Sequence, residues 1–165
     1  MVKDFERTYL KFYKEIYQFA FSLSLSAEDS SDLSQEAFIR LLKEYNKGVT
    51  IENPRAWLYK VILNLWRNEH NKSKKQKTKN LHINTPSTDH NTPERNFLKI
   101  EKRDLIFDCM NQLSPIERDI ILLYHDGFSY AEIAELLDMR TTSVGTTLSR
   151  SIKKLTTKLK AKHHE

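Results

Sequence analysis

Hydroxyl and cationic side chains lie along one side of the segment TTSVGTTLSRSIKKL, residues 141–155. If the segment is a helix, its apolar stripe is made of Val144, Leu148, Ile152 and Leu155. The opposite side carries Ser143, Thr146, Ser149, Arg150 and Lys153. Short hydroxyl side chains allow close approach to DNA, and arginine or lysine reaches phosphates or guanine edges. This side predicts a DNA-binding surface; the alternative is a solvated face on an ordinary helical hairpin.

A second short helix is predicted immediately before this segment. Ser129 and Glu132 have the spacing of a capping box, which marks a helix start. The inward side is predicted to be Ile133, Ala134 and Leu137, and residues 138–140 form the turn. Two short helices, a tight turn and a small alanine at the contact are typical of a helix-turn-helix. Further lysines follow, at Lys154, Lys158, Lys160 and Lys162.

Gly145 lies inside the second of these helices, where glycine costs about 0.5–1 kcal/mol relative to alanine. Two explanations remain open from the sequence. Either the glycine permits close packing against the helix at residues 129–137, or it permits close approach of the backbone to a phosphate.

A second set of polar residues repeats every three or four positions in NPRAWLYKVILNLWRNEHNK, residues 53–72. The set is Lys60, Asn64, Arg67 and Asn71, with Trp66 nearby. Asn53 as N-cap and Pro54 at the first helical position predict the helix start. The predicted apolar stripe is Trp57, Leu58, Val61, Ile62 and Leu65. Holding a separated DNA strand needs a positive track and flat groups that stack on bases, and this helix supplies both.

The rest of the chain positions these residues on helices. Apolar residues at helical spacing predict helices before residue 46 and again from about residue 98 to residue 125, and no strand pattern of useful length occurs. Residues 70–96 are rich in Lys, Ser, Thr, Asn and Pro and predict a flexible linker. The sequence therefore predicts an all-α protein with two small helical domains, residues 1–69 and 97–165, joined by that linker.

Several other classes of protein fit poorly. Lys and Arg outnumber Asp and Glu by 27 to 22, which weakly favours a polyanionic partner. The single cysteine, Cys109, excludes an internal disulfide, and its apolar neighbours predict a buried residue. No histidine has a carboxylate or cysteine at ligand spacing, so we expect no metal, no cofactor and no catalytic site. With a charged N-terminal stretch and no long apolar run, we expect a cytoplasmic protein without direct membrane insertion.

Four segments in order resemble the bacterial sigma-70-type initiation factors of the compact, extracytoplasmic-function group. DLSQEAFIRLLKEY (Asp32–Tyr45) is similar to the family's region 2.2, and residues 53–72 to regions 2.3 and 2.4. LSPIERDIILLYHDGFSYAEIAELLDM followed by TSVGTTLSRSIKKL is similar to region 4. The resemblance implies a region 2 three-helix bundle and a region 4 helix-turn-helix. It also implies a sigma factor that directs promoter-specific transcription initiation.

The resemblance also implies partners and sites. Core RNA polymerase is an implied partner, through its β′ clamp helices and β subunit. The helix with Asp32, Gln35 and Glu36 is implied to dock on the β′ clamp helices. The minus-10 promoter element is implied to contact Asn53, Lys60, Asn64, Arg67 and Asn71. For the minus-35 element we expect Thr142, Ser143, Thr146, Thr147, Arg150 and Lys153. An anti-sigma factor is a further implied partner.

The sequence departs from the family pattern where the family often has Lys and then Arg in the recognition helix. Here those positions are Gly145 and Thr147, so the usual promoter sequence does not carry over. The alternative function is a conventional helix-turn-helix regulator with an N-terminal sensing or dimerising domain. Such a regulator would explain residues 129–155 but not an acidic helix at residues 32–36 beside a basic third helix.

Overall fold

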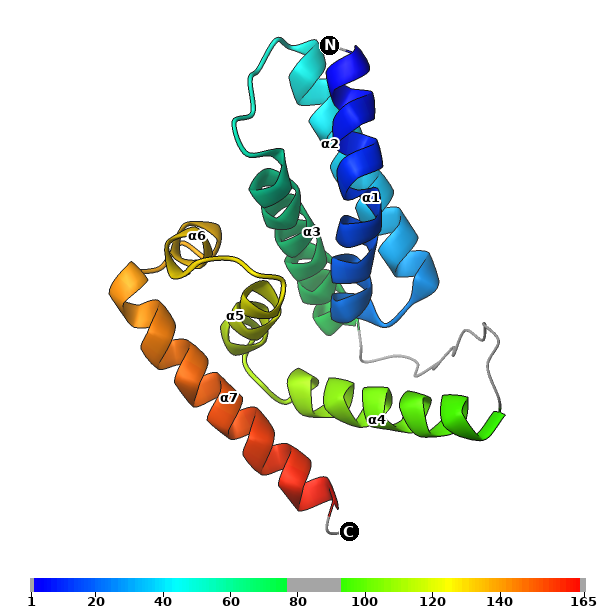
Figure 1. The fold of residues 1–165 in the computed structure, drawn as a ribbon, viewed down its shortest axis with the longest axis vertical. Helices are drawn as coiled ribbons and strands as arrows, with labels where there is room; N and C mark the ends of the chain where they lie inside the picture. Colours follow the sequence, from blue (N-terminus) through cyan, green and yellow to red (C-terminus); the bar gives the residue numbers. More distant parts are fainter. Residues whose placement is uncertain (1, 77–92, 164–165) are drawn as a thin grey trace. The chain divides into compact units, whose positions relative to one another are not determined.

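The computed structural model describes the backbone of residues 2–76 and 93–163 and the side chains of residues 3–69 and 102–162. Within these ranges all regular secondary structure is α-helical, with short connecting loops and no strand (Figure 1). The helices are α1 Val2–Ser24, α2 Ala27–Asn46, α3 Pro54–Gln76, α4 Pro93–Asn111, α5 Pro115–His125, α6 Tyr130–Leu136 and α7 Thr141–His163. They divide into two compact units, α1–α3 and α4–α7. The predicted all-α fold with two helical domains is confirmed.

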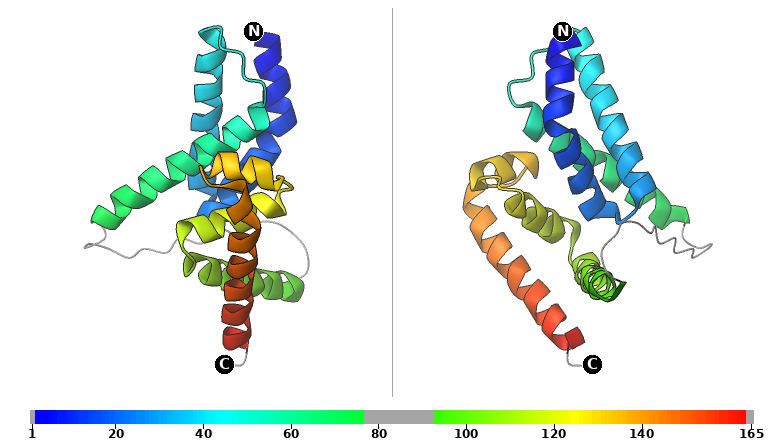
Figure 2. Two further views of the ribbon diagram at one scale, coloured as in Figure 1. Left: turned by 90° about the vertical axis from the view of Figure 1, so that its left-hand side faces the viewer. Right: turned by 45° about the vertical axis from the view of Figure 1, so that its right-hand side comes forward.

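The first unit is a three-helix bundle. Helices α1 and α2 run antiparallel side by side, and α3 crosses them in both further views (Figure 2). Its core is apolar, with Ile16, Phe19, Leu23, Leu33, Leu41, Leu58 and Ile62 fully or almost fully buried. The turn into α2 is capped, because Ser26 accepts a hydrogen bond from the Asp29 backbone N–H at 3.1 Å.

The start of α3 is fixed by Asn53, as the sequence predicts. Its side-chain oxygen accepts a hydrogen bond from the Ala56 backbone N–H at 3.1 Å, and Pro54 is the first helical residue. Helix α3 continues to Gln76, so helical structure covers the first part of the segment predicted as a linker. The division at residues 70 and 96 stays a prediction, and residues 77–92 lie outside the described part of the chain.

The second unit contains the helix-turn-helix, α6 and α7, supported by α4 and α5. Helices α5 and α6 each begin with a capping box, Ser114 with Glu117 at α5 and, as predicted, Ser129 with Glu132 at α6. Gly127 ends the α5 region with φ +85°, a backbone conformation that favours glycine. Cys109, Ile120, Leu123, Ile133 and Val144 have no exposed surface and form the centre of this unit.

The turn between α6 and α7 is made without glycine. Asp138 takes a positive φ of 52°, which aspartate tolerates better than most side chains. The backbone N–H of Met139 bonds to the Ala134 carbonyl at 2.9 Å, which closes the turn. Ile133, Ala134 and Leu137 are buried as predicted, and Leu136 joins them. No described helix is both long enough and apolar enough to cross a membrane.

Candidate nucleic-acid and polymerase interfaces

The buried side of α7 differs from the predicted stripe at Ile152, and Leu155 is only half-buried. Val144 and Leu148 are buried, but Ile152 is 44% exposed and Ser151 is fully buried in its place. Ser151 donates a hydrogen bond to the Thr147 carbonyl at 2.7 Å, so its hydroxyl is satisfied inside the unit. The prediction of Ile152 as a core residue is wrong, because a back-bonded serine packs at that position instead.

The corrected stripe places the candidate minus-35 residues on α7. With about 100° per residue, Thr142, Thr146 and Lys153 point about 150–170° away from the buried side. Arg150 lies about 130° away. These four side chains are exposed. The other two candidates, Ser143 and Thr147, are half-buried and lie on the same flank of this surface, beside Arg150. The six residues thus span the outward side of one helix.

Gly145 packs closely against α6. An ideal Cβ built on it would lie 3.2 Å from Cε2 of Tyr130, the first residue of α6. The Tyr130 ring also neighbours Tyr124, with ring centroids 6.1 Å apart. Close helix packing therefore accounts for the glycine, and of the two explanations that the sequence leaves open it is the one with a visible contact.

Three lysines at four-residue spacing connect α7 to α4 and α5. Lys154 pairs with Glu117, Lys158 donates to the Gln112 side chain at 2.9 Å, and Lys162 pairs with Asp108 at 3.4 Å. The sequence suggests a basic exit from the recognition helix, whereas these three side chains hold α7 against its own unit. The charges of Lys154 and Lys162 are therefore paired within the protein, and the Lys158 ammonium is hydrogen-bonded to a neutral amide.

Glu117 has two partners at once. One carboxylate oxygen accepts the Ser114 backbone N–H at 3.0 Å, and the other accepts from Lys154. The hydrogen bond from Lys154, with the backbone hydrogen bond from Ser114, lowers the pKa of Glu117 from 4.5 to about 2. The carboxylate thus caps α5 and fixes α7 through one side chain.

Helix α3 presents its candidate minus-10 residues on one side. Taking Leu58, Tyr59, Ile62 and Leu63 as the buried side, Lys60, Asn64 and Arg67 point about 110–170° away from it. Asn64 is exposed, and Lys60 and Arg67 are half-buried. Asn53 is exposed at the end of the loop that precedes α3. Asn71 continues the same line along the helix by position, but its side chain is outside the described residues.

The buried stripe of α3 also differs from the prediction. Tyr59 and Leu63 are buried at 0% and 1% exposure, whereas Trp57, Val61 and Leu65 are only half-buried. Tyr59 belongs to the core because its ring lies 4.2 Å from that of Phe19 and its hydroxyl donates to Glu15 at 3.0 Å. These contacts come from α1, so the spacing within α3 does not reveal them.

The two tryptophans of α3 lie on opposite sides of the helix by position. The sequence predicts Trp57 in the apolar stripe, yet by helical position it lies within about 20° of Asn64, on the outward side. Trp66 lies close to the centre of the buried side by the same geometry. Both side chains are half-buried. Trp57 is therefore the aromatic group placed beside the polar face of α3.

Helix α2 carries the three candidate polymerase-binding residues on its outward side. Asp32 and Gln35 are exposed and Glu36 is half-buried. Gln35 donates to the Ser31 hydroxyl at 3.0 Å, and Glu36 accepts from Arg40 at 2.7 Å. Ile39, which is 46% exposed, lies between them on the same face and does not stand out in the sequence.

No group of three or more His, Cys, Asp or Glu side chains suited to a metal ion occurs within the described ranges. The chemistry that the described polar side chains offer is hydrogen bonding and charge pairing. Three exposed helix sides, on α2, α3 and α7, carry it.

Comparison with known families matches both units. The family described as sigma-70 region 2 matches residues 8–76, and that described as sigma-70, region 4 matches residues 103–155. Together these matches cover well over half of the chain. They fall in the expected order, and each coincides with one compact unit.

Individual relatives agree with the family matches. The chain is 26% identical over 149 residues to the RNA polymerase sigma factor YlaC of Bacillus subtilis, covering 88% of this chain and 86% of that protein. It is 27% identical over 136 residues to the ECF RNA polymerase sigma-E factor of Haemophilus influenzae, covering 76% of this chain and 70% of the relative.

Solved structures share the fold. The sigma factor RpoE of Bartonella quintana, in complex with the anti-sigma factor NepR, matches with a TM-score of 0.73 at 21% identity, covering 96% of this chain and 98% of that one. CnrH, in complex with the cytosolic domain of CnrY, matches with a TM-score of 0.69 at 20% identity, covering 98% and 90%. With a region 2 bundle and a region 4 helix-turn-helix in order, the chain belongs to the sigma-70 family of RNA polymerase sigma factors, in its extracytoplasmic-function group, and serves transcription initiation rather than an enzymatic reaction.

Proposed function

We propose that this sigma factor divides its work among three helix sides: α7 reads the minus-35 element, α3 holds the minus-10 element, and α2 docks on core RNA polymerase. The observation that carries the assignment is the placement of each candidate set on one outward side of one helix, opposite that helix's buried residues. A conventional regulator is not favoured, because residues 8–76 match sigma-70 region 2.

On α7, the contacts with DNA come from the exposed hydroxyls and cations. Thr146 and Arg150 are the residues that we assign to base edges, and Lys153 to a phosphate. An arginine can bond a guanine through two parallel hydrogen bonds, and a short hydroxyl admits the helix deep into the major groove. Thr142, Ser143 and Thr147 border this surface and position the helix. Gly145 serves packing, so the promoter preference arises from its neighbours.

On α3, Lys60 and Arg67 contact the backbone of the minus-10 region, and Asn64 and Asn71 bond bases. Trp57 lies beside Asn64 and offers a flat ring to a base that has left the stack. Asn53, at the end of the loop of residues 47–53, contributes at the upstream end of α3. Its side chain is also the helix cap, so it couples the loop to the helix.

On α2, Asp32, Gln35 and Glu36 bind core polymerase at the β′ clamp helices. Two carboxylates on one helix side fit a basic partner surface. Ile39 adds an exposed apolar group at the centre of that side, where desolvated contacts count most. The β subunit is assigned to the same complex by the family resemblance.

An anti-sigma protein is the further partner that we propose. Two fold relatives, RpoE and CnrH, are known in complexes with NepR and CnrY. The place of action is the cytoplasm, where core polymerase and promoter DNA are found.

The proposed function is tested by asking whether promoter-specific transcription requires both this chain and core polymerase. Purified chain added to core polymerase should give specific run-off transcripts from promoter DNA that core alone does not transcribe, and it should co-purify with core. The chain alone should bind that promoter DNA poorly. Tight operator-like binding without core, and no core-dependent transcript, would favour the regulator instead.

A further inference from the structure

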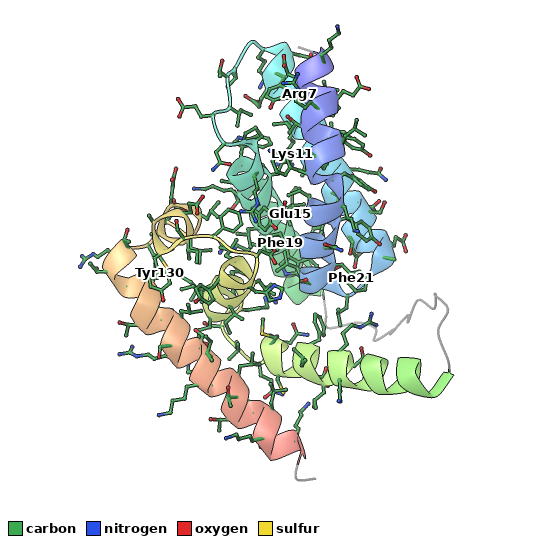
Figure 3. All side chains as sticks on the ribbon, in the orientation of Figure 1. Arg7, Lys11, Glu15, Phe19, Phe21 and Tyr130 are labelled. Carbon is green, nitrogen blue, oxygen red and sulfur yellow. The ribbon has the colours of Figure 1, made fainter. Side chains whose placement is uncertain are left out.

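A cleft opens in the first unit between α1 and the start of α3, with a volume of about 540 Å³. Its lining includes Arg7, Lys11, Phe12 and Glu15 from α1 and Asn53 and Arg55 at the start of α3. Arg7, Lys11 and Glu15 follow one another along α1, each one turn further on (Figure 3). The cleft therefore combines cations from α1 with the capped end of α3.

The cleft is separate from the polar face of α3. Arg55 points to the buried side of α3, toward α1, whereas Lys60, Asn64 and Arg67 lie on the opposite side of that helix. Asn53 is the residue common to both, because it lines the cleft and precedes the first turn of α3. A strand that passes Asn53 can therefore leave one surface and enter the other.

Some charged side chains in the cleft are paired with each other, and others are available to a ligand. Glu15 accepts from the Arg55 guanidinium at 2.6 Å and from the Tyr59 hydroxyl at 3.0 Å, so this carboxylate and Arg55 neutralise each other. Arg7 and Lys11 are exposed, and neither has an ion pair within the part of the chain that the structure describes. Glu52 is the remaining acid. Two available cations thus face one available carboxylate, which leaves the cleft net positive.

The cleft also contains a flat apolar group. Phe12 is half-buried, and the Lys11 ammonium lies 4.9 Å from the centre of its ring. An aromatic ring beside cations is the combination with which proteins hold single-stranded nucleic acids, because bases stack on the ring while phosphates meet the charges.

We propose that this cleft binds one nucleotide of an unpaired nucleic-acid strand, with its phosphate at Arg7 and Lys11 and its base against Phe12. The site rests on the proposed function, since the strand it takes is the one separated at α3. The cleft would be a second binding site for that strand, on the opposite side of α3 from Asn64. Asn53 lies between the two sites.

The test uses the full chain and a short fluorescein-labelled single-stranded oligonucleotide, with binding followed by anisotropy over a series of salt concentrations. The double variant Arg7→Gln/Lys11→Gln is compared with Lys3→Gln/Lys14→Gln, which removes the same charge from exposed lysines of α1 outside the cleft. We expect the slope of log affinity against log salt to fall by about 0.7 for each phosphate that the first variant no longer neutralises, and to change less in the control. Equal slopes and affinities in the two variants would overturn the proposal.

The ring is tested separately by Phe12→Leu, which keeps an apolar side chain, with helix content checked by circular dichroism. Loss of the ring should weaken strand binding by roughly fivefold or more. An unchanged affinity in folded protein contradicts a stacked base. If this variant does not fold, the exposed Arg7 and Lys11 pair still decides the question.

Two further experiments extend the test. One distinguishes a nucleic-acid strand from a free nucleotide as the ligand, and the other tests the assignment of α3 separately from the cleft. Adenosine monophosphate should not displace the oligonucleotide at concentrations near the oligonucleotide's own Kd; displacement there would show a free-nucleotide site and overturn the strand proposal. Arg67→Gln should weaken strand binding through α3. If Arg67→Gln weakens binding and the Arg7/Lys11 variant does not, the cleft proposal fails while the α3 assignment stands; if neither does, both fail.

Discussion

The ring of Tyr130 lies against the backbone of Gly145, with Cε2 of the ring 3.2 Å from the place of a glycine Cβ. Tyr130 begins α6 and Gly145 lies in the first turns of α7, so the contact joins the two helices of the helix-turn-helix. The tyrosine is 45% exposed, which leaves its ring room to move. The glycine therefore sets how closely α7 approaches the start of α6.

Replacing Gly145 by Ala should raise the free energy of unfolding slightly, by less than about 1 kcal/mol. Alanine gains about 0.5–1 kcal/mol in a helix interior, and displacement of the Tyr130 ring by a few tenths of an ångström offsets part of it. Binding to the minus-35 element should be unchanged. Thermal unfolding and DNA binding measured on the same protein check both statements.

The matched control is the same substitution in a Tyr130→Ala background. With the ring absent, the full helix-propensity gain should appear, so the effect of Gly145→Ala should be larger there. A stable Gly145→Ala protein that no longer binds the minus-35 element would show instead that the glycine makes room for DNA.

Lowering the pH should reduce the free energy of unfolding of the second unit, because Glu117 becomes protonated. Its pKa is lowered from 4.5 in the unfolded chain to about 2 in the folded protein. As pH falls below 4.5 the unfolded state binds the proton first, so the stabilisation present above that pH is lost progressively as pH approaches 2. Urea unfolding at a series of pH values checks the direction.

The control for this prediction is Glu117→Gln. It should be less stable than the wild type at neutral pH, and the difference should shrink as the pH falls from 4.5 toward 2. A difference that stays constant over that range would mean that the Lys154 pairing contributes nothing measurable.

Reversing two charges on α2 should abolish docking on core polymerase. In Asp32→Lys/Glu36→Lys the outward side of α2 would repel a basic partner surface, and co-purification with core should be lost while the helix content stays. Glu6→Lys/Glu44→Lys, with the same change in net charge, should still co-purify. Normal core binding by the folded Asp32/Glu36 variant would remove α2 from the interface.

Removal of the Arg67 cation should change the salt dependence of promoter binding. For promoter binding by holoenzyme, Arg67→Gln should lower the magnitude of the slope of log affinity against log salt by roughly one, since the variant neutralises one phosphate fewer. Lys14→Gln, on the exposed side of α1, is the control of equal charge. An unchanged slope with normal promoter opening would place α3 away from DNA.

The helices and their ends could be predicted from the sequence because their signals are local. Asn53, Ser114 and Ser129 cap as their spacing indicates, since each bond joins residues three positions apart. The outward side of α7 was predictable for a similar reason. A helix fixes the angle between neighbours, whatever it packs against.

Contacts between helices were not predictable in this way. Ile152 exceeds Ser151 in hydrophobicity, yet Ser151 is buried because its hydroxyl bonds within α7. Tyr59 is held by Glu15, which lies 44 positions away, and Lys154 by Glu117 across 37 positions. Such partners depend on how helices meet, and spacing along one helix carries no signal for them.

The most direct test of the division between α3 and α7 is transcription from a randomised promoter library by core polymerase with the purified chain. We expect two enriched sequence blocks, one near position −10 and one near −35. Arg150→Ala should remove the preference at specific positions of the upstream block and leave the downstream block intact, whereas Lys160→Ala, which changes an exposed lysine of the same helix, should alter neither block. Enrichment of a single block, or an upstream block that Arg150→Ala leaves unaltered, would contradict the division of work between α3 and α7.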